Sequence, residues 1–99
     1  MFYAIIGEDR PGSLDDRLAA RPAHLARLEA LKAAGRLLLA GPCPAIDAEN
    51  PGPAGFTGSL IVAEFESLPA AEQWAREDPY CTAGVFRAVT VKPFRKVLP

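Results

Sequence analysis

The order in which apolar runs follow one another constrains the fold of this chain more than any other feature of its sequence. Short runs rich in aromatic and β-branched residues, typical of strands, alternate with longer runs in which apolar residues recur at helical spacing. The order is strand, helix, strand, strand, helix, strand. Two βαβ-like halves of this kind predict an α+β, ferredoxin-like βαββαβ sandwich, in which two helices cover one face of a four-stranded sheet.

The helical runs carry start and stop signals. Ser13 is a suitable N-cap for a first helix that begins at Leu14, whereas Pro22 suits the first turn of a helix that begins there. The sequence leaves both starts open. Ser67 predicts the start of the second helix, which we expect to end at Asp78, because a residue that precedes proline avoids the helical conformation.

The remaining apolar runs predict strands at residues 2–7, 36–40, 59–66 and 85–91. The second and third strands are joined by segment 41–58, which contains four prolines. A connection of this length is longer than most in a compact domain, and loops of this length are often functional. Its proline and glycine residues predict a rigid excursion of the chain.

Length, charge and cysteine content exclude several classes of protein. The 99 residues are expected to form one domain, residues 1–99. The net charge is −1 and no basic stripe is present, so we expect no nucleic-acid partner. No apolar run approaches the ~20 residues of a membrane span, and the N-terminus lacks signal-peptide features, so we expect a cytoplasmic protein without a membrane partner. Cys43 and Cys81 are expected to be reduced thiols, with a disulfide between them as the alternative.

Two of the expected strands are apolar on both faces. In the first strand, Ala4 and Ile6 lie on one face, and Tyr3 and Ile5 lie on the other. The strand at 59–66 has the same character. Two helices cover only one face of the sheet, so a second sheet is needed for the other, and a second copy of the chain is the obvious source. We therefore predict a homodimer in which the two sheets pack face to face.

His24 is the only histidine in the chain, and it lies on or beside the apolar stripe of the first helix. A carboxylate beside an imidazole fixes its tautomer and raises its basicity. Asp78, at the end of the second helix, is a candidate partner if the first helix begins near Leu14, and Asp9 is the rival if it begins at Pro22. The alternative is that His24 is a structural core residue and that Asp78 only ends a helix.

Several stretches, taken together and in this order, resemble the YciI-like (YCII-related) family. The resemblance runs nearly end to end, and the stretches that carry it are 21–28, 35–38, 40–42, 54–59, 75–80 and 91–94. It implies a dimeric α/β barrel built from ferredoxin-like subunits, and an active site with a histidine–aspartate pair at the positions of His24 and Asp78. One relative in this family is a dehydrochlorinase that acts on a chlorinated hydroxyhydroquinone. Related dimeric barrels include muconolactone isomerase and small monooxygenases.

Four further residues are candidate substrate-binding residues. Arg17, Arg21 and Arg27 are expected to be mostly solvated or paired with Asp15, Asp16 or Glu29. Of the three, Arg21 is the one that can point at an anionic substrate. Pro42 can permit the close approach of a ligand. Ser59 offers a hydroxyl at the start of a strand, and Tyr80 can line a pocket or close the end of the barrel.

Two functions are compatible with these residues. The first is a small-molecule enzyme in which His24 acts as general base or acid and Asp78 orients it, in an elimination, isomerisation or lactone-type reaction. The second is a non-catalytic module that binds a small ligand, or a partner, in the same cavity. No nucleotide-binding motif and no metal-ligand spacing is present in the sequence, so we expect neither a metal nor an organic cofactor.

Overall fold

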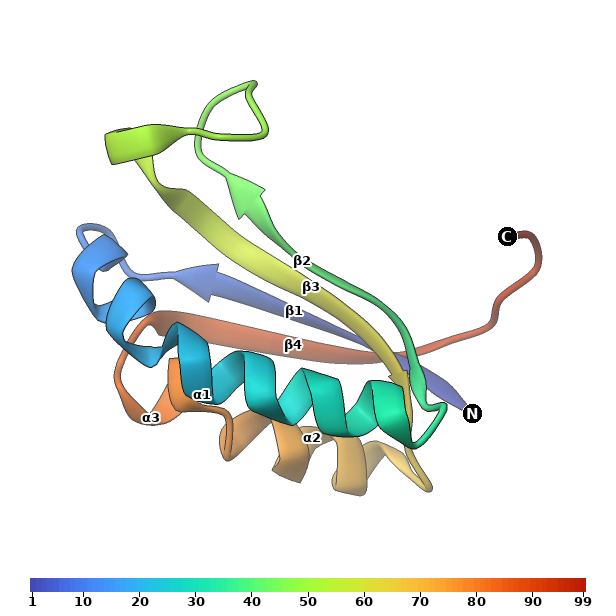
Figure 1. The fold of residues 1–99 in the computed structure, drawn as a ribbon. Coiled ribbons are helices and arrows are strands. Elements are labelled where there is room, and N and C mark those ends of the chain that lie inside the picture. The colour runs from blue at the N-terminus through green and yellow to red at the C-terminus, as the bar shows by residue number, and fades with distance from the viewer.

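The computed structural model describes residues 1–99 and forms a four-stranded antiparallel sheet with helices on one face (Figure 1). The strand order is β2-β3-β1-β4. The elements are β1 (Phe2–Asp9), α1 (Leu14–Ala33), β2 (Leu37–Pro44), the 3-10 turn η1 (Gly52–Ala54), β3 (Phe56–Glu64), α2 (Leu68–Arg76), α3 (Pro79–Thr82) and β4 (Phe86–Phe94). The predicted ferredoxin-like βαββαβ architecture is confirmed, with the short α3 as an addition.

Helix α1 begins at Leu14 and continues without a break through Pro22, so the earlier of the two predicted starts is correct. Proline in a helix interior removes one backbone hydrogen bond, and α1 continues for eleven residues beyond Pro22 without it. Ser13 occupies the N-cap position as predicted, but its hydroxyl makes no capping bond. Its carbonyl instead accepts the first helical hydrogen bond, from the Arg17 amide at 2.8 Å. Gly35, with a φ of 70°, lies just beyond the end of the helix.

The hairpin between β2 and β3 has longer strands and a shorter loop than the sequence predicts. β2 extends to Pro44 and β3 begins at Phe56, so the irregular connection is 45–55 and not 41–58. The prediction was wrong because Pro42 and Pro44 lie within β2 and not in the loop that follows it. β2 is an edge strand, where a proline whose nitrogen faces outward costs no ladder hydrogen bond.

The second helical region divides into two helices. The Ser67 hydroxyl accepts a hydrogen bond from the Ala70 amide at 3.2 Å, as expected for the cap of α2. α2 ends at Arg76, earlier than predicted. Asp78 then caps α3, because its side chain accepts a hydrogen bond from the Tyr80 amide at 2.9 Å. Residues Pro79–Thr82, beyond the predicted end of the second helix, are therefore helical as well.

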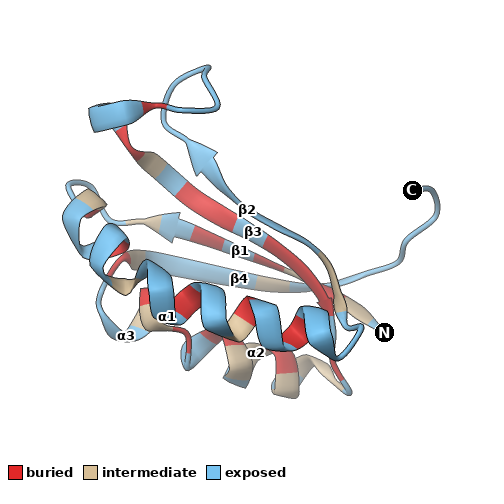
Figure 2. Ribbon diagram, in the orientation of Figure 1, coloured by how far each residue is buried: buried red, intermediate tan, exposed pale blue.

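The core lies between the helices and one face of the sheet. Buried side chains are concentrated in the central strands β1 and β3, whereas the edge strands β2 and β4 are largely exposed (Figure 2). The core cluster comprises Tyr3, Ile5, Leu28, Leu31, Ile61, Ala63, Phe65, Ala71 and Ala75. Trp74 is partly buried and packs against this cluster.

The opposite face of the sheet carries no helix and is also apolar. Because neighbouring residues of a strand point to opposite faces, Ile6 and Leu60 point away from the helices, where the register pairs them directly. They remain 40% and 36% exposed in the single chain. Leu39 and Phe94 lie on the same face and are exposed to a similar degree. This face is one of the two apolar faces that the sequence indicates.

We predict that Gly58→Ala destabilises the fold, whereas Gly41→Ala in the same hairpin does not. A Cβ atom at Gly58 would overlap the carbonyl oxygen of Gly7, which the β1–β3 ladder holds in place, but a Cβ atom at Gly41 meets no atom within 4 Å. We expect Gly58→Ala to lower the free energy of unfolding by about 2 kcal/mol or more, and Gly41→Ala to change it by less than about 0.5 kcal/mol. Urea denaturation at equal protein concentrations measures both, and equal losses would contradict this account of the hairpin.

Candidate functional site

A cavity of about 150 Å³ lies among α1, α3 and the strands β2 and β3. Its polar lining comes from Arg17, Arg21, His24, Ser59 and Tyr80. The rest of its wall is apolar or backbone and consists of Leu25, Leu28, Ala40, Gly41, Pro42 and Ile61. Every residue that the sequence suggested for substrate binding therefore borders this one space.

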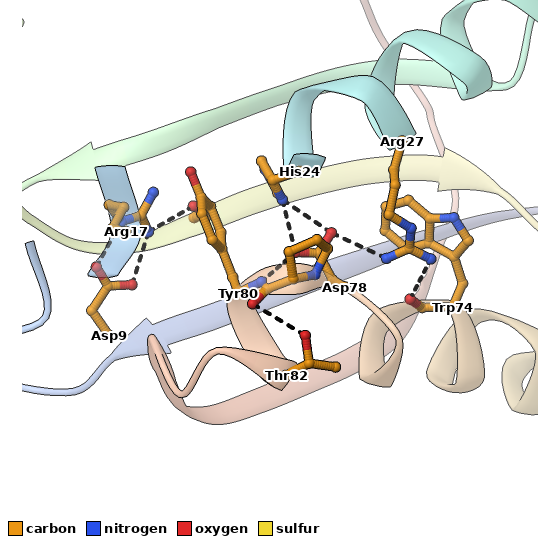
Figure 3. A network of polar contacts seen from close by, with 10 residues as sticks. Asp9, Arg17, His24, Arg27, Trp74, Asp78, Tyr80 and Thr82 are labelled. Atoms are coloured by element: carbon orange, nitrogen blue, oxygen red, sulfur yellow. Dashed lines mark hydrogen bonds and ion pairs between the residues drawn. The ribbon is translucent and has the colours of Figure 1, made fainter. Parts of the chain in front are cut away.

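The imidazole of His24 contacts the carboxylate of Asp78 (Figure 3). Nδ1 lies 2.9 Å from Oδ1 and 3.0 Å from Oδ2, and the two residues are only 5% and 2% exposed. The contact required a first helix beginning near Leu14, and α1 does begin there. Asp9, the rival partner, is bound to a different residue.

Further hydrogen bonds fix the Asp78 carboxylate in place. The Tyr80 amide donates to Oδ1 at 2.9 Å, and Nη1 of Arg27 donates to Oδ2 at 3.2 Å. Arg27 is itself held, because Nη2 donates to the Trp74 carbonyl at 2.9 Å and its guanidinium lies 4.2 Å from the centre of the Trp74 ring. With Nδ1 of His24 directed at this carboxylate, Nε2 is the ring nitrogen left to act on a ligand in the cavity.

A buried ion pair between Arg17 and Asp9 forms the other end of the site. Nε and Nη2 of Arg17 each donate to a carboxylate oxygen at 2.8 Å, and Nη2 also donates to the Ser59 hydroxyl at 2.9 Å. Burial alone would lower the pKa of Arg17, but the hydrogen bonds and negative charge of Asp9 outweigh it and raise that pKa above its usual value. The guanidinium therefore stays charged although only 4% of its side chain is exposed.

Tyr80 lies between the two polar pairs (Figure 3). Its ring stacks on the His24 ring, with centroids 3.9 Å apart and planes inclined by 16°, and the Arg17 guanidinium lies 4.5 Å from the Tyr80 centroid. Burial raises the pKa of the Tyr80 phenol above its usual value, partly opposed by the charge of Arg17. At neutral pH Tyr80 is therefore a neutral phenol that can donate a hydrogen bond.

The expectation that Arg17 and Arg27 would be solvated or paired with acids nearby in the sequence was wrong. Their partners are 8 and 51 residues away in the chain. A signal for Arg17 was available, because it lies seven residues before His24 and so on the same face of the helix. Arg27 lies three residues after His24, so the helical spacing also placed it near the partner of His24. The identity of that partner depends on the turn between α2 and α3.

The remaining polar groups form no metal site. No group of three or more His, Cys, Asp or Glu residues lies close enough together to hold a metal ion. Cys43 is exposed, Cys81 is partly buried, and both are free thiols. Burial raises the pKa of the Cys81 thiol, and the nearby charge of Asp78 raises it further. None of the helices is both long and apolar enough to cross a lipid bilayer.

A family model of the YCII-related domain matches residues 1–95. The chain belongs to the YCII-related family. This confirms the family resemblance drawn from the sequence. Protein YciI of Escherichia coli is 60% identical over 97 residues, which are 98% of this chain and 99% of that protein. An uncharacterized protein of Haemophilus influenzae is 59% identical over the same share of both chains.

Among solved structures, one enzyme is similar to this YCII-related chain in sequence and in fold. The 5-chloro-2-hydroxyhydroquinone dehydrochlorinase TftG of Burkholderia phenoliruptrix, solved in complex with 2,5-dihydroxybenzoquinone, is 34% identical. The match has a TM-score of 0.83 and covers 96% of this chain and 94% of TftG. Protein Atu4242 of Agrobacterium tumefaciens shares the fold alone, with 18% identity, a TM-score of 0.51 and coverage of 98% and 94%. This chain is therefore similar in both sequence and fold to at least one enzyme.

We predict that the buried Arg17–Asp9 pair contributes more to the free energy of unfolding than an exposed pair with the same 2.8 Å distance between nitrogen and oxygen. Asp9→Ala leaves the Arg17 charge buried without a partner, which costs about 3–5 kcal/mol. Asp16→Ala breaks the 2.8 Å pair between Arg10 and Asp16, whose side chains are 46% and 57% exposed, respectively. This loss costs less than about 1 kcal/mol. Urea denaturation of the two variants measures this difference.

The double variant Arg17→Met with Asp9→Leu shows whether the stability is lost because the ion pair is missing or because a buried charge has no partner. Removing both charges should cost less stability than Asp9→Ala alone, because no unpaired charge stays buried. Equal losses in the Asp9→Ala and Asp16→Ala variants would contradict the view that burial makes the Arg17 pair special.

Proposed function

We propose that this chain is a small-molecule enzyme in which His24 performs general acid–base chemistry and Asp78 orients and stabilises the His24 ring. The observation that carries the proposal is the 2.9 Å contact between Nδ1 of His24 and Asp78, made by a histidine that borders a cavity. A carboxylate on one ring nitrogen makes the other nitrogen the site of proton exchange.

In the proposed reaction, Nδ1 of His24 keeps its proton and donates a hydrogen bond to the Asp78 carboxylate. Nε2 takes a proton from an O–H or C–H group of the ligand, and the resulting imidazolium is stabilised by the Asp78 carboxylate. The electron pair left on the ligand then expels a leaving group, or shifts a double bond and recovers a proton elsewhere. These two outcomes are an elimination and an isomerisation, and opening or closing a lactone needs the same groups.

The size of the cavity and the nature of one relative support a small oxygenated ring as the substrate. A cavity of about 150 Å³ has the volume of an engineered protein cavity that holds benzene. The 34% identical TftG is a dehydrochlorinase of a chlorinated hydroxyhydroquinone. We therefore propose that the substrate is a phenolic or quinone-like ring, with Tyr80 and Ser59 as hydrogen-bonding groups in the wall.

We predict that His24→Ala abolishes most turnover of any such substrate. A screen of chlorinated hydroquinones, hydroxyquinones and lactones, followed by chloride release or ultraviolet absorbance, identifies a reaction to measure. We expect His24→Ala to lower kcat by about 10²–10⁴-fold, because general acid–base catalysis contributes that much. Asp16→Ala, which changes only an exposed pair, serves as the control and should keep the wild-type rate. Turnover that survives in His24→Ala would contradict the role proposed for His24, and ligand binding without turnover of any compound would favour the non-catalytic binding module.

We also propose that the uncovered face of the sheet packs against the same face of a second copy. Exposed apolar side chains on this face come from three strands and include Ile6, Leu39 and Leu60. A contiguous apolar surface of this kind marks an interaction site, and a two-fold dimer buries the same patch on both copies.

We predict that Leu60→Glu converts a dimer into a monomer. The wild-type protein should sediment with twice the mass of one chain, and a charge at the centre of the uncovered face should halve that mass, because an unpaired charge opposes burial. Leu18→Glu is the matched control, since Leu18 is a 54% exposed leucine on α1 and not on the sheet. A monomeric wild-type protein, or dissociation of both variants alike, would contradict the proposed interface.

A further inference from the structure

The charged side chains around the cavity are compensated within the chain, with one exception. Arg17 is paired with Asp9 through two hydrogen bonds of 2.8 Å. Asp78 is engaged by His24 and by Arg27, at the other end of the site (Figure 3). Each of these groups therefore has its partner before any ligand enters the cavity.

Arg21 is the exception. It lines the cavity and is exposed, yet it takes part in none of the ion pairs or side-chain hydrogen bonds of the chain. The helical positions three and four residues away could supply an acidic neighbour, but they hold no aspartate or glutamate: they are Arg17, Leu18, His24 and Leu25.

The wall opposite α1 gives Arg21 no partner either. The residues of β2 and β3 that border the cavity are uncharged, and no carboxylate lies among the lining residues. The charge of Arg21 nevertheless acts on the cavity wall, since it opposes the effect of burial on the pKa of the Tyr80 phenol. The cavity is thus a partly enclosed space with one uncompensated positive charge at its edge.

We propose that the cavity selects a small planar anion, such as an ionised phenol, enol or hydroxyquinone, and that Arg21 recognises its negative charge. This inference rests on the proposed function only in taking the cavity as the ligand site. Side chains three apart on a helix have Cβ atoms about 5–6 Å apart, so one small ring reaches both Arg21 and His24. The anionic oxygen lies at Arg21, and the group that exchanges a proton lies at Nε2 of His24.

The proposed arrangement explains why Arg21 is separate from the Arg17 pair. A guanidinium already bound to a carboxylate offers little net charge to a ligand, whereas an unpaired guanidinium provides a charge-assisted hydrogen bond to an oxygen anion. Arg17 therefore shapes the wall of the cavity, and Arg21 determines which charge state of the ligand is bound.

The test compares two ring compounds of nearly equal shape and different charge. 2,5-Dihydroxybenzoquinone is ionised at neutral pH, and 2,5-diaminobenzoquinone is its neutral counterpart. Binding of each is measured by isothermal titration calorimetry to the wild-type protein and to Arg21→Gln, Arg21→Lys and Lys32→Gln. Lys32 is an exposed residue in the last turn of α1, so Lys32→Gln removes one positive charge from the same helix outside the cavity.

We expect the wild type to prefer the anion and Arg21→Gln to weaken its binding about tenfold, as the loss of one charge-assisted hydrogen bond implies. Arg21→Lys should recover part of that affinity, and Lys32→Gln should bind as the wild type does. Equal affinity for both compounds, no binding of the anion, or an unchanged affinity in Arg21→Gln would overturn the inference. Binding that depends on Arg21, without turnover of any compound, would sustain it while the proposed enzymatic function fails.

Discussion

The geometry of the site depends on the buried pair between Arg17 and Asp9. A guanidinium removed from water must be matched by an opposite charge and by hydrogen bonds, and Asp9 and Ser59 supply both. These three residues belong to α1, β1 and β3, and the ring of Tyr80 from α3 lies against the guanidinium. One interaction therefore fixes the mutual position of four elements, and through Tyr80 it sets the plane in which the His24 ring lies.

The buried face of helix α1 has a polar part and an apolar part. Arg17 and His24 point inward from its N-terminal and middle turns, whereas Leu28 and Leu31 enter the core from its C-terminal turns. The apolar part supplies the burial that stabilises the fold, at about 25 cal/mol for each Å² removed from water. The polar part is tolerated because each of its buried groups has a partner, and no buried side-chain nitrogen or oxygen lacks a hydrogen bond.

Much of the fold followed from the sequence, because the order of elements and the helical period of α1 are local signals. The pairing of His24 with Asp78 could be stated as one of two options, since the choice depended only on where α1 begins. The partners of Arg17 and Arg27 could not be deduced in this way. They lie on other elements, and the register and turns that bring them together are set by the packing of the whole chain. The length of the β2–β3 connection was overestimated because Pro42 and Pro44 mask the continuation of β2, which an edge strand permits.

The two walls of the cavity differ in what they contribute. The ionisable side chains come from the helices, whereas the facing wall at Ala40–Pro42 belongs to the edge strand β2 and offers small side chains and backbone. A strand at the edge of a sheet is bonded on one side only, so its side chains change at little cost to the fold. Substitutions in β2 can therefore reshape this wall of the cavity without displacing His24 or Asp78, which belong to other elements. The part of the fold that sets the shape of the cavity is thus separate from the part that carries its ionisable groups.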